Sequence, residues 1–181
     1  MSKDRLYSLS KPLITAKQIS SRIKELAKLI TSTYPENSQL ILVGILKGSF
    51  LFLADLMREL PGPIEIDFIQ ASSYYAGTKS SMEISIIKDL SIPIAGKDVI
   101  VIEDIIDSGN TIKKIKAILS SRHPKSIMLC SLLSKPSRRE TDVIIDWVGF
   151  TIPDIFIVGY GLDVNEKFRN LPYLAEAIST E

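Results

Sequence analysis

The chain has 181 residues, of which 45% are hydrophobic and 24% are charged, a composition typical of a soluble globular protein and unlike that of a disordered one. Its 22 basic and 21 acidic residues leave a net charge of +1, so charge gives no reason to expect nucleic acid or an anionic membrane as the main partner. The length favours a single domain over residues 1–181, with a large core that needs no disulfide.

Targeting signals and metal-binding cysteines are not apparent. Residues 1–11 lack the apolar core of a signal peptide, and no apolar run approaches the roughly 20 residues that a membrane span requires. Cys130 lies in an apolar run and is predicted to be a small buried residue, while His123 beside Pro124 is predicted to lie at the surface. One cysteine and one histidine exclude a structural zinc site. We expect a cytoplasmic protein.

The first part of the chain shows a helix, a strand and a second helix. Apolar residues recur at three- and four-residue spacing over 15–30, and Thr15 and Gln18 stand three apart as a capping box requires, so a helix is predicted to begin at Thr15. Residues 39–46 are rich in β-branched side chains and predict a strand. A second helix is predicted over about 50–60, ending at a Pro-Gly-Pro sequence.

The next part predicts an antiparallel extension. Residues 64–71 alternate acidic and apolar side chains, which indicates a strand with one wet face near an edge of the sheet. The stretch from Ser72 to Ser81 has no periodicity and is predicted to be an exposed loop, either a connector or a lid, before a strand at about 82–88. We expect the whole piece, 64–88, to form an added flap or hood.

The most informative stretch runs from Val99 to Thr111. It begins with four β-branched apolar residues, typical of a strand buried on both faces, and Glu103 and Asp104 follow at once. A short run of turn-forming residues then precedes a helical pattern. A strand, a polar loop and a helix N-terminus together predict an anion site at the carboxyl end of the sheet. The alternative is a loop that only caps the helix.

The remaining elements complete an α/β pattern. Residues 126–133 and 143–148 predict strands, 155–159 a short last strand, and the tail from Asn165 at most a short helix. Strands that alternate with helices favour an α/β fold with a mainly parallel sheet.

The acids of the central stretch narrow the ligand. Glu103, Asp104 and Asp107 fall within five residues and repel one another unless a cation or hydroxyl groups lie between them. Gly109 permits close approach of the backbone to a ligand. There is no Walker pattern, and Val164 stands where a dinucleotide fingerprint would need its third glycine. These residues indicate that the ligand is a polyhydroxylated, metal-associated phosphate ester.

The same stretch closely resembles the phosphoribosyl pyrophosphate (PRPP) signature of type I phosphoribosyltransferases, and the resemblance extends from about Leu40 to Leu174 toward the hypoxanthine- and guanine-using branch of that family. The other matching motifs, in order, are Leu46-Lys47-Gly48, Ser73-Tyr74, Lys135, Phe156-Ile157, Gly161-Leu162-Asp163 and Phe168-Arg169. The resemblance implies the type I phosphoribosyltransferase fold, a mainly parallel twisted sheet flanked by helices, with a small hood and a flexible lid hairpin at about 72–81.

The resemblance also implies roles around the ribose. Asp107 would be the general base that takes the proton from N7 of the purine, and Glu103 and Asp104 would face the ribose hydroxyls and Mg²⁺. The 5-phosphate would be held by main-chain amides and hydroxyls of Ser108, Gly109, Asn110 and Thr111. An aspartate of ordinary pKa, ~3.9, is ionised at neutral pH and can accept a proton.

Two groups would hold the pyrophosphate. Lys47 and Gly48 would bind it, with the Leu46–Lys47 peptide in the cis form, and Arg169 would offer a planar fork to its oxygens. Ser73 and Tyr74 in the lid would close over it and exclude water.

The purine would meet residues from the last third of the chain. Lys135 would donate to its 6-oxo group, Phe156 would stack on the base, and the main chain at Ile157 would read its edge. Asp163 would be a further Mg²⁺ ligand beside the purine, so that the implied metal set is Glu103, Asp104 and Asp163.

Taken together, the resemblance implies a purine-salvage transferase that moves the phosphoribosyl group of PRPP to N9 of hypoxanthine, and of guanine, with Mg²⁺ as cofactor and a homodimer or homotetramer as the assembly. Two alternatives stay open: a regulator that keeps this fold but binds RNA or DNA, and an enzyme for xanthine or another base. The presence of Asp107, Lys135 and Asp163 favours the enzyme.

Overall fold

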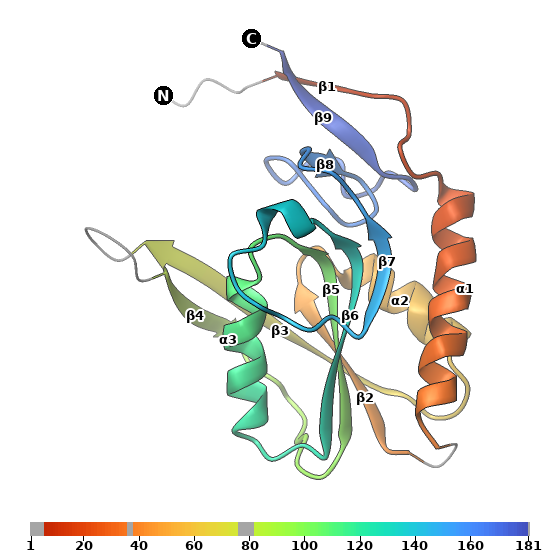
Figure 1. Cartoon of the computed structure of the whole chain (residues 1–181), viewed down its shortest axis with the longest axis vertical. Coiled ribbons are helices and arrows are strands. Elements are labelled where there is room, and N and C mark those ends of the chain that lie inside the picture. The colour runs from red at the N-terminus through yellow and green to blue at the C-terminus, as the bar shows by residue number, and fades with distance from the viewer. Residues whose placement is uncertain (1–5, 36–37, 76–81, 181) are drawn as a thin grey trace.

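The computed structural model describes residues 6–35, 38–75 and 82–180, and shows a large sheet flanked by helices with a smaller sheet beyond one end of it (Figure 1). In chain order the elements are β1 (Leu6–Leu9), α1 (Ala16–Thr33), β2 (Leu40–Leu46), α2 (Phe50–Glu59), β3 (Glu65–Tyr75), β4 (Met82–Lys88), β5 (Asp98–Ile106), α3 (Asn110–Ser120), β6 (Ser126–Ser134), the 3-10 turn η1 (Pro136–Arg138), β7 (Trp147–Thr151), β8 (Ile157–Val158) and β9 (Ala175–Thr180).

The large sheet confirms the predicted α/β architecture. Its strand order is β4-β3-β2-β5-β6-β7, and every neighbouring pair is parallel except β3 and β4. The strand β5 lies between β2 and β6, so that its carboxyl end falls near the middle of the sheet edge where ligands of open α/β sheets bind.

The strand β5 is buried on both faces, as its composition predicted. Ile100 and Ile102 belong to a core cluster shared with α1 and α2, whereas Val99 and Val101 belong to a second cluster shared with α3. Side chains of a strand alternate between its faces, so four consecutive apolar residues serve both cores. Cys130 is fully buried in the first cluster, which confirms its structural role.

Two local predictions are confirmed near the ends of helices. The capping box of α1 is complete, because Gln18 N donates to Thr15 Oγ1 at 3.3 Å and Thr15 N donates to Gln18 Oε1 at 2.9 Å. His123, just after α3, is exposed. No helix in the described ranges is long and apolar enough to cross a membrane.

The prediction for the C-terminal tail is wrong. The tail forms the strand β9, which pairs antiparallel with β1 and with β8 in a three-stranded sheet, so β8 is not the last strand (Figure 1). Only Ala175 and Ala177 of β9 are buried, a pattern too weak to reveal a strand without its partners.

The predicted flap over 64–88 is also partly wrong. The strand β3 belongs to the large sheet, parallel to β2, and only β4 runs antiparallel to it. The loop predicted to start at Ser72 is instead strand as far as Tyr75, because polar residues of β3 pair with β4. The rest of the predicted lid, 76–81, lies outside the described residues.

The strand at 143–148 was predicted too early, since β7 begins at Trp147. Val143 and Ile145 are apolar because they pack on the second core cluster from an irregular segment.

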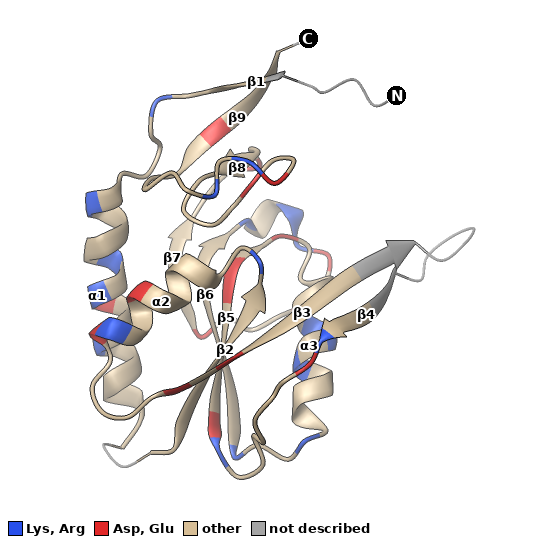
Figure 2. Ribbon diagram, turned by 180° about the vertical axis from the view of Figure 1, so that it is seen from behind, with Lys and Arg blue, Asp and Glu red and all other residues tan. Residues whose placement is uncertain are grey.

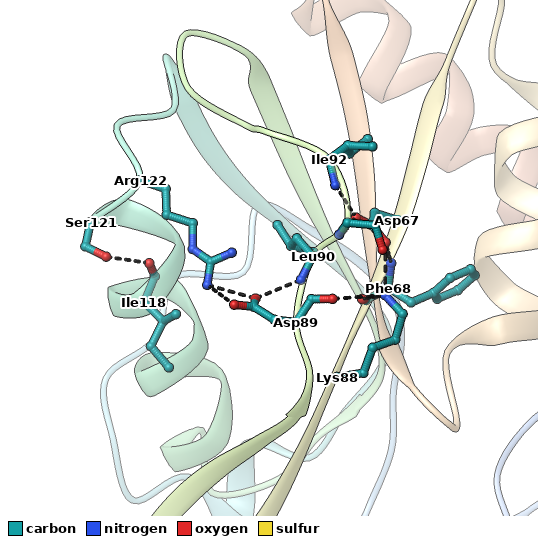
Figure 3. Close-up of polar contacts among 10 residues, drawn as sticks. Asp67, Phe68, Lys88, Asp89, Leu90, Ile92, Ile118, Ser121 and Arg122 are labelled. Carbon is teal, nitrogen blue, oxygen red and sulfur yellow. Dashed lines mark hydrogen bonds and ion pairs between the residues drawn. The ribbon is translucent and has the colours of Figure 1, made fainter.

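A polar network fastens β3 to the segment that leads into β5 (Figure 3). The buried Asp67 accepts hydrogen bonds from the backbone amides of Phe68, Ser91 and Ile92, and from Lys88 Nζ at 3.2 Å. Burial opposes the ionisation of Asp67, but these donors outweigh it, so its pKa lies below the ordinary value.

Candidate active site

The candidate site lies at the carboxyl end of β5. Glu103 and Asp104 are residues of the strand itself, which extends two residues further than Asp104, to Ile106. Helix α3 begins after Gly109, whose φ of 86° is in the left-handed region that favours glycine. The N-cap residue has no side chain, and within the loop Ser108 Oγ accepts a hydrogen bond from the Asn110 amide at 3.3 Å.

The loop before α3 is held from one side by residues that the sequence did not single out. The carbonyl of Ser108 accepts hydrogen bonds from the amides of Glu140 and Thr141, at 3.0 and 3.1 Å. Asn110 donates through Nδ2 to Glu140 Oε2 at 2.7 Å, and its Oδ1 accepts from Thr141 Oγ1 at 2.5 Å. The Asn110 side chain therefore fixes the loop to residues 140–141.

Two consecutive residues near the end of β5, Glu103 and Asp104, carry carboxylates. Burial, and then the neighbouring Asp104, raise the pKa of Glu103 well above its usual value, and Glu103 Oε2 is buried without a hydrogen-bond partner in the described chain. Burial also raises the pKa of Asp104 to about 6, against the Ile105 amide and Arg169, which lower it. Two buried carboxylates are stable in their charged forms only when a cation or hydroxyl donors lie close to them.

Asp107 and Lys135 form a second feature of the site. Lys135 Nζ lies 3.5 Å from Asp107 Oδ1, an oxygen that is buried and has no hydrogen-bond partner among the described residues. The Lys135 side chain is 8% exposed, and its backbone amide donates to Ile106 O at 3.0 Å, which ties the end of β6 to the loop. A buried ammonium facing an unsatisfied carboxylate oxygen leaves both groups ready for a polar ligand.

The turn after β2 closes on the same acids. The Leu46–Lys47 peptide is cis, as the resemblance implied. A Cβ added to Gly48 would lie 1.4 Å from Asp104 Oδ2, so only glycine fits beside that carboxylate. Lys47 Nζ pairs with Glu166 Oε1 at 3.1 Å.

A loop between β8 and β9 brings Asp163 and Arg169 to the turn. Arg169 Nη2 pairs with Asp163 Oδ1 at 2.7 Å and with Glu166 Oε2 at 3.0 Å. Glu166 thus bridges the two cations, Lys47 and Arg169, assigned to pyrophosphate, and their hydrogen bonds lower its pKa. Sequence reasoning missed Glu166, which lies between the matching motifs at 161–163 and 168–169. In Figure 2, acidic and basic segments of the loop that follows β8 lie beyond the end of β5.

The residues assigned to the purine differ in exposure. Phe156 is 52% exposed, and its ring stacks on Tyr7 with centroids 6.4 Å apart. Ile157 is buried in β8, paired with Glu176 of β9. Thr111 is half-buried in the first turn of α3. Ser73 and Tyr74 lie in β3, and their side chains are outside what the structure describes.

The described residues do not form a complete metal site by themselves. No group of three or more His, Cys, Asp or Glu side chains in the described ranges could hold a metal ion, so Glu103, Asp104 and Asp163 do not make a closed cage. Asp163 nevertheless lies near enough to Asp104 to raise its pKa. Magnesium commonly takes one or two carboxylates, with waters and substrate oxygens filling its remaining positions, and the unpaired Glu103 oxygen fits such a partial site.

Comparison with known proteins agrees with this geometry. Residues 13–165 match the family described as "Phosphoribosyl transferase domain". The hypoxanthine phosphoribosyltransferase of Salmonella typhimurium is 50% identical over 167 residues, covering 92% of this chain and 94% of that protein. The hypoxanthine-guanine phosphoribosyltransferase of Bacillus subtilis is 45% identical over 168 residues, covering 93% of each chain.

The fold is shared with solved structures of the same kind. A hypoxanthine phosphoribosyltransferase from Staphylococcus aureus superposes with a TM-score of 0.89 at 45% identity, covering 94% of this chain and 92% of the other. The α/β architecture is thus that of a type I phosphoribosyltransferase. The chain belongs to the phosphoribosyltransferase family, among relatives that are hypoxanthine and hypoxanthine-guanine transferases.

Proposed function

We propose that this phosphoribosyltransferase catalyses the Mg²⁺-dependent transfer of the phosphoribosyl group from PRPP to N9 of hypoxanthine, with guanine as a second acceptor. The products are IMP or GMP and pyrophosphate, and the reaction belongs to purine salvage. Relatives named for hypoxanthine and for hypoxanthine-guanine transfer support these two acceptors.

The Asp107–Lys135 pair carries the proposal. In a 6-oxopurine, N7 and O6 are neighbouring atoms on one edge of the base. Asp107 Oδ1 and Lys135 Nζ, 3.5 Å apart, are suited to the two atoms at once, because the carboxylate can accept the N7 proton while the ammonium donates to O6. The 6-amino group of adenine cannot accept the second bond, so the pair favours 6-oxopurines.

The reaction breaks one bond and forms another at C1 of the ribose. N9 of the purine attacks C1, the bond to pyrophosphate breaks, and the N7 proton passes to Asp107. The main chain at 108–111 would hold the 5-phosphate at the start of α3, where the helix dipole favours an anion. Lys47 and Arg169 would exchange Glu166 for the pyrophosphate oxygens. Catalysis would then come mainly from positioning and electrostatics.

Glu103, Asp104 and Asp163 are the residues that would hold Mg²⁺, together with substrate oxygens. When bound, the ion would supply neutralising charge for the departing pyrophosphate. Burial raises the pKa of Glu103 and raises that of Asp104 to about 6, and at Asp104 backbone hydrogen bonds and Arg169 offset only part of that rise. Phe156, exposed at 52%, is free on its solvent side to stack on the base.

The direct test follows both products together. With hypoxanthine, PRPP and Mg²⁺, we expect IMP and pyrophosphate to form in equal amounts, and an excess of a divalent-metal chelator to stop the reaction until Mg²⁺ is restored. Chromatographic measurement of IMP, with an enzymatic assay of pyrophosphate, gives the ratio. Hypoxanthine consumption without pyrophosphate, or full turnover in the presence of the chelator, would contradict the proposal.

Several features that accompany the proposal stay predictions: a lid that includes Ser73, Tyr74 and residues 76–81, a homodimer or homotetramer, a single domain over the whole chain and a cytoplasmic location. The lid is consistent with the proposed reaction, because PRPP and its oxocarbenium-like centre need protection from water.

A further inference from the structure

Tyr160 occupies an unusual position in the loop that carries Asp163 and Arg169. Its backbone has a φ of 45°, between Gly159 and Gly161, which also have positive φ values. A left-handed conformation is costly for a bulky residue and persists where the surroundings enforce it. The Tyr160 side chain is nevertheless buried, with 6% of the residue exposed.

The phenol of Tyr160 joins this loop to α2. Tyr160 Oη donates a hydrogen bond to Asp55 Oδ2 at 2.5 Å, across 105 residues of sequence. Helix α2 starts directly after the Lys47-Gly48 turn, so Asp55 lies on the element that continues the turn. Burial and this bond to Asp55 raise the pKa of Tyr160, so the phenol keeps its proton and remains a donor.

The neighbouring residue makes a backbone contact with the same turn. A Cβ added to Gly161 would lie 2.1 Å from Gly48 O, so the two glycine backbones touch. Gly161 also exchanges two hydrogen bonds with Arg169: its amide donates to Arg169 O at 3.0 Å, and Arg169 Nη1 donates to Gly161 O at 2.8 Å. Gly161 therefore contacts both the turn that carries Lys47 and Arg169, so its position affects the distance between Lys47 and Arg169.

From these contacts we propose that the Tyr160–Asp55 hydrogen bond is a positioning device for the pyrophosphate end of the site, an inference that rests on the proposed function. By fixing the 159–163 loop against α2, it presses Gly161 onto Gly48 and so sets the distance between Lys47 and Arg169. Neither Tyr160 nor Asp55 touches the substrate. The hydrogen bond affects the affinity for pyrophosphate and for PRPP. Lys135 and Phe156, which are assigned to the purine, are held by other elements.

The test is Tyr160→Phe, which keeps the ring in its buried position and removes only the donor. We expect the KM for PRPP and the Kd for Mg²⁺-pyrophosphate, measured by calorimetry, to rise about fivefold or more, the value of one hydrogen bond in a buried setting. The KM for hypoxanthine at saturating PRPP should stay within about twofold of the wild-type value, because the lost hydrogen bond makes no contact with the purine.

Two further variants separate positioning from general damage. Asp55→Asn keeps an acceptor and should retain pyrophosphate affinity close to the wild-type value. Asp55→Ala should lose as much affinity as Tyr160→Phe, and a variant that carries both Asp55→Ala and Tyr160→Phe should lose no more than either one alone. Tyr34→Phe is the matched control, because the Tyr34 hydroxyl is buried beside Ser126 at the start of β6, away from the Lys47 turn, so its loss should leave pyrophosphate affinity unchanged.

The outcomes distinguish this inference from the proposed function. Wild-type protein that makes no IMP from hypoxanthine and PRPP contradicts the proposed function, and the pyrophosphate titration then decides the positioning role alone. Wild-type protein that turns over, with pyrophosphate affinity in Tyr160→Phe equal to that in Tyr34→Phe, overturns the positioning role only. Equal losses for PRPP and hypoxanthine would also overturn it, because they would indicate a general structural defect.

Discussion

Asp107 lies beside the cation of Lys135, just before the loop that opens α3. One of its oxygens is buried and unsatisfied, and the ammonium of Lys135 lies 3.5 Å away to stabilise the negative charge. The local sequence predicted an anion site here, but the purine and the role of Asp107 came only from the family resemblance. Lys135 lies on a different strand, and no local pattern reveals which distant side chain will face a loop.

For Asp107→Asn we expect PRPP binding to change little and kcat to fall by about 10²–10⁴-fold, because the amide keeps the shape of the side chain but cannot accept the N7 proton. Steady-state kinetics with a separate measurement of PRPP affinity separates the two effects. Asp142→Asn, at an exposed position after the loop that backs Ser108, is the control. Full activity in Asp107→Asn would rule out the role of general base.

Gly48 tests the packing of the pyrophosphate turn against the acids. In Gly48→Ala the methyl group would overlap the Asp104 carboxylate, so we expect kcat/KM for PRPP to fall by at least about tenfold, as displacement of a catalytic group commonly costs. The control is Gly62→Ala, whose Cβ meets nothing within 4 Å. Its positive φ should cost about 1 kcal/mol of stability and leave kcat/KM unchanged. Equal kinetics in the two variants would contradict the account.

At the scale of elements, strands with strong patterns were predictable and strands that depend on partners were not. The strand β5 packs against two core clusters, so its run of apolar residues is continuous and can be recognised in the sequence without knowledge of the fold. The strand β9 has only two buried alanines and forms because β1 and β8 supply hydrogen-bonding partners. The second half of β3 is polar and was predicted as loop, yet it pairs with β4. Pairing across the sheet overrides local propensity in both cases.

Asp67 holds the β3–β4 side of the sheet to the segment before β5. Asp67→Asn replaces a charged acceptor of three backbone amides by a group with one acceptor, and we expect the free energy of unfolding at pH 7 to fall by about 1.5–3 kcal/mol. Urea denaturation measures the difference. Asp142→Asn, an exposed position, should change it by less than about 0.5 kcal/mol.

The same network predicts a pH dependence. Because the pKa of Asp67 is lower in the folded protein than in the unfolded chain, its contribution is complete above the unfolded value of ~3.9 and is lost as pH falls through the folded value. The gap in stability between wild type and Asp67→Asn should therefore narrow below about pH 4. A gap that stays constant in acid would show that the charge of Asp67 contributes nothing.

At the scale of the whole molecule, the candidate site draws on four regions of the chain that are distant in sequence. The end of β5 supplies the acids and the anion loop, the turn after β2 supplies Lys47, the end of β6 supplies Lys135, and the loop before β9 supplies Asp163 and Arg169. Local reasoning reached only the first region, because it is contiguous. The other regions required the family resemblance, and Glu166 and Tyr160 were found only when the fold placed them between the others.

The central claim is that this site joins the phosphoribosyl group of PRPP to a 6-oxopurine. A purine panel tests it most directly: hypoxanthine, guanine, xanthine and adenine, each with PRPP and Mg²⁺, with nucleotide formation followed by chromatography. We expect rapid IMP formation, GMP formation, and no nucleotide from adenine, because Lys135 needs a 6-oxo acceptor. Efficient use of adenine, or the absence of nucleotide from both hypoxanthine and guanine, would contradict the account.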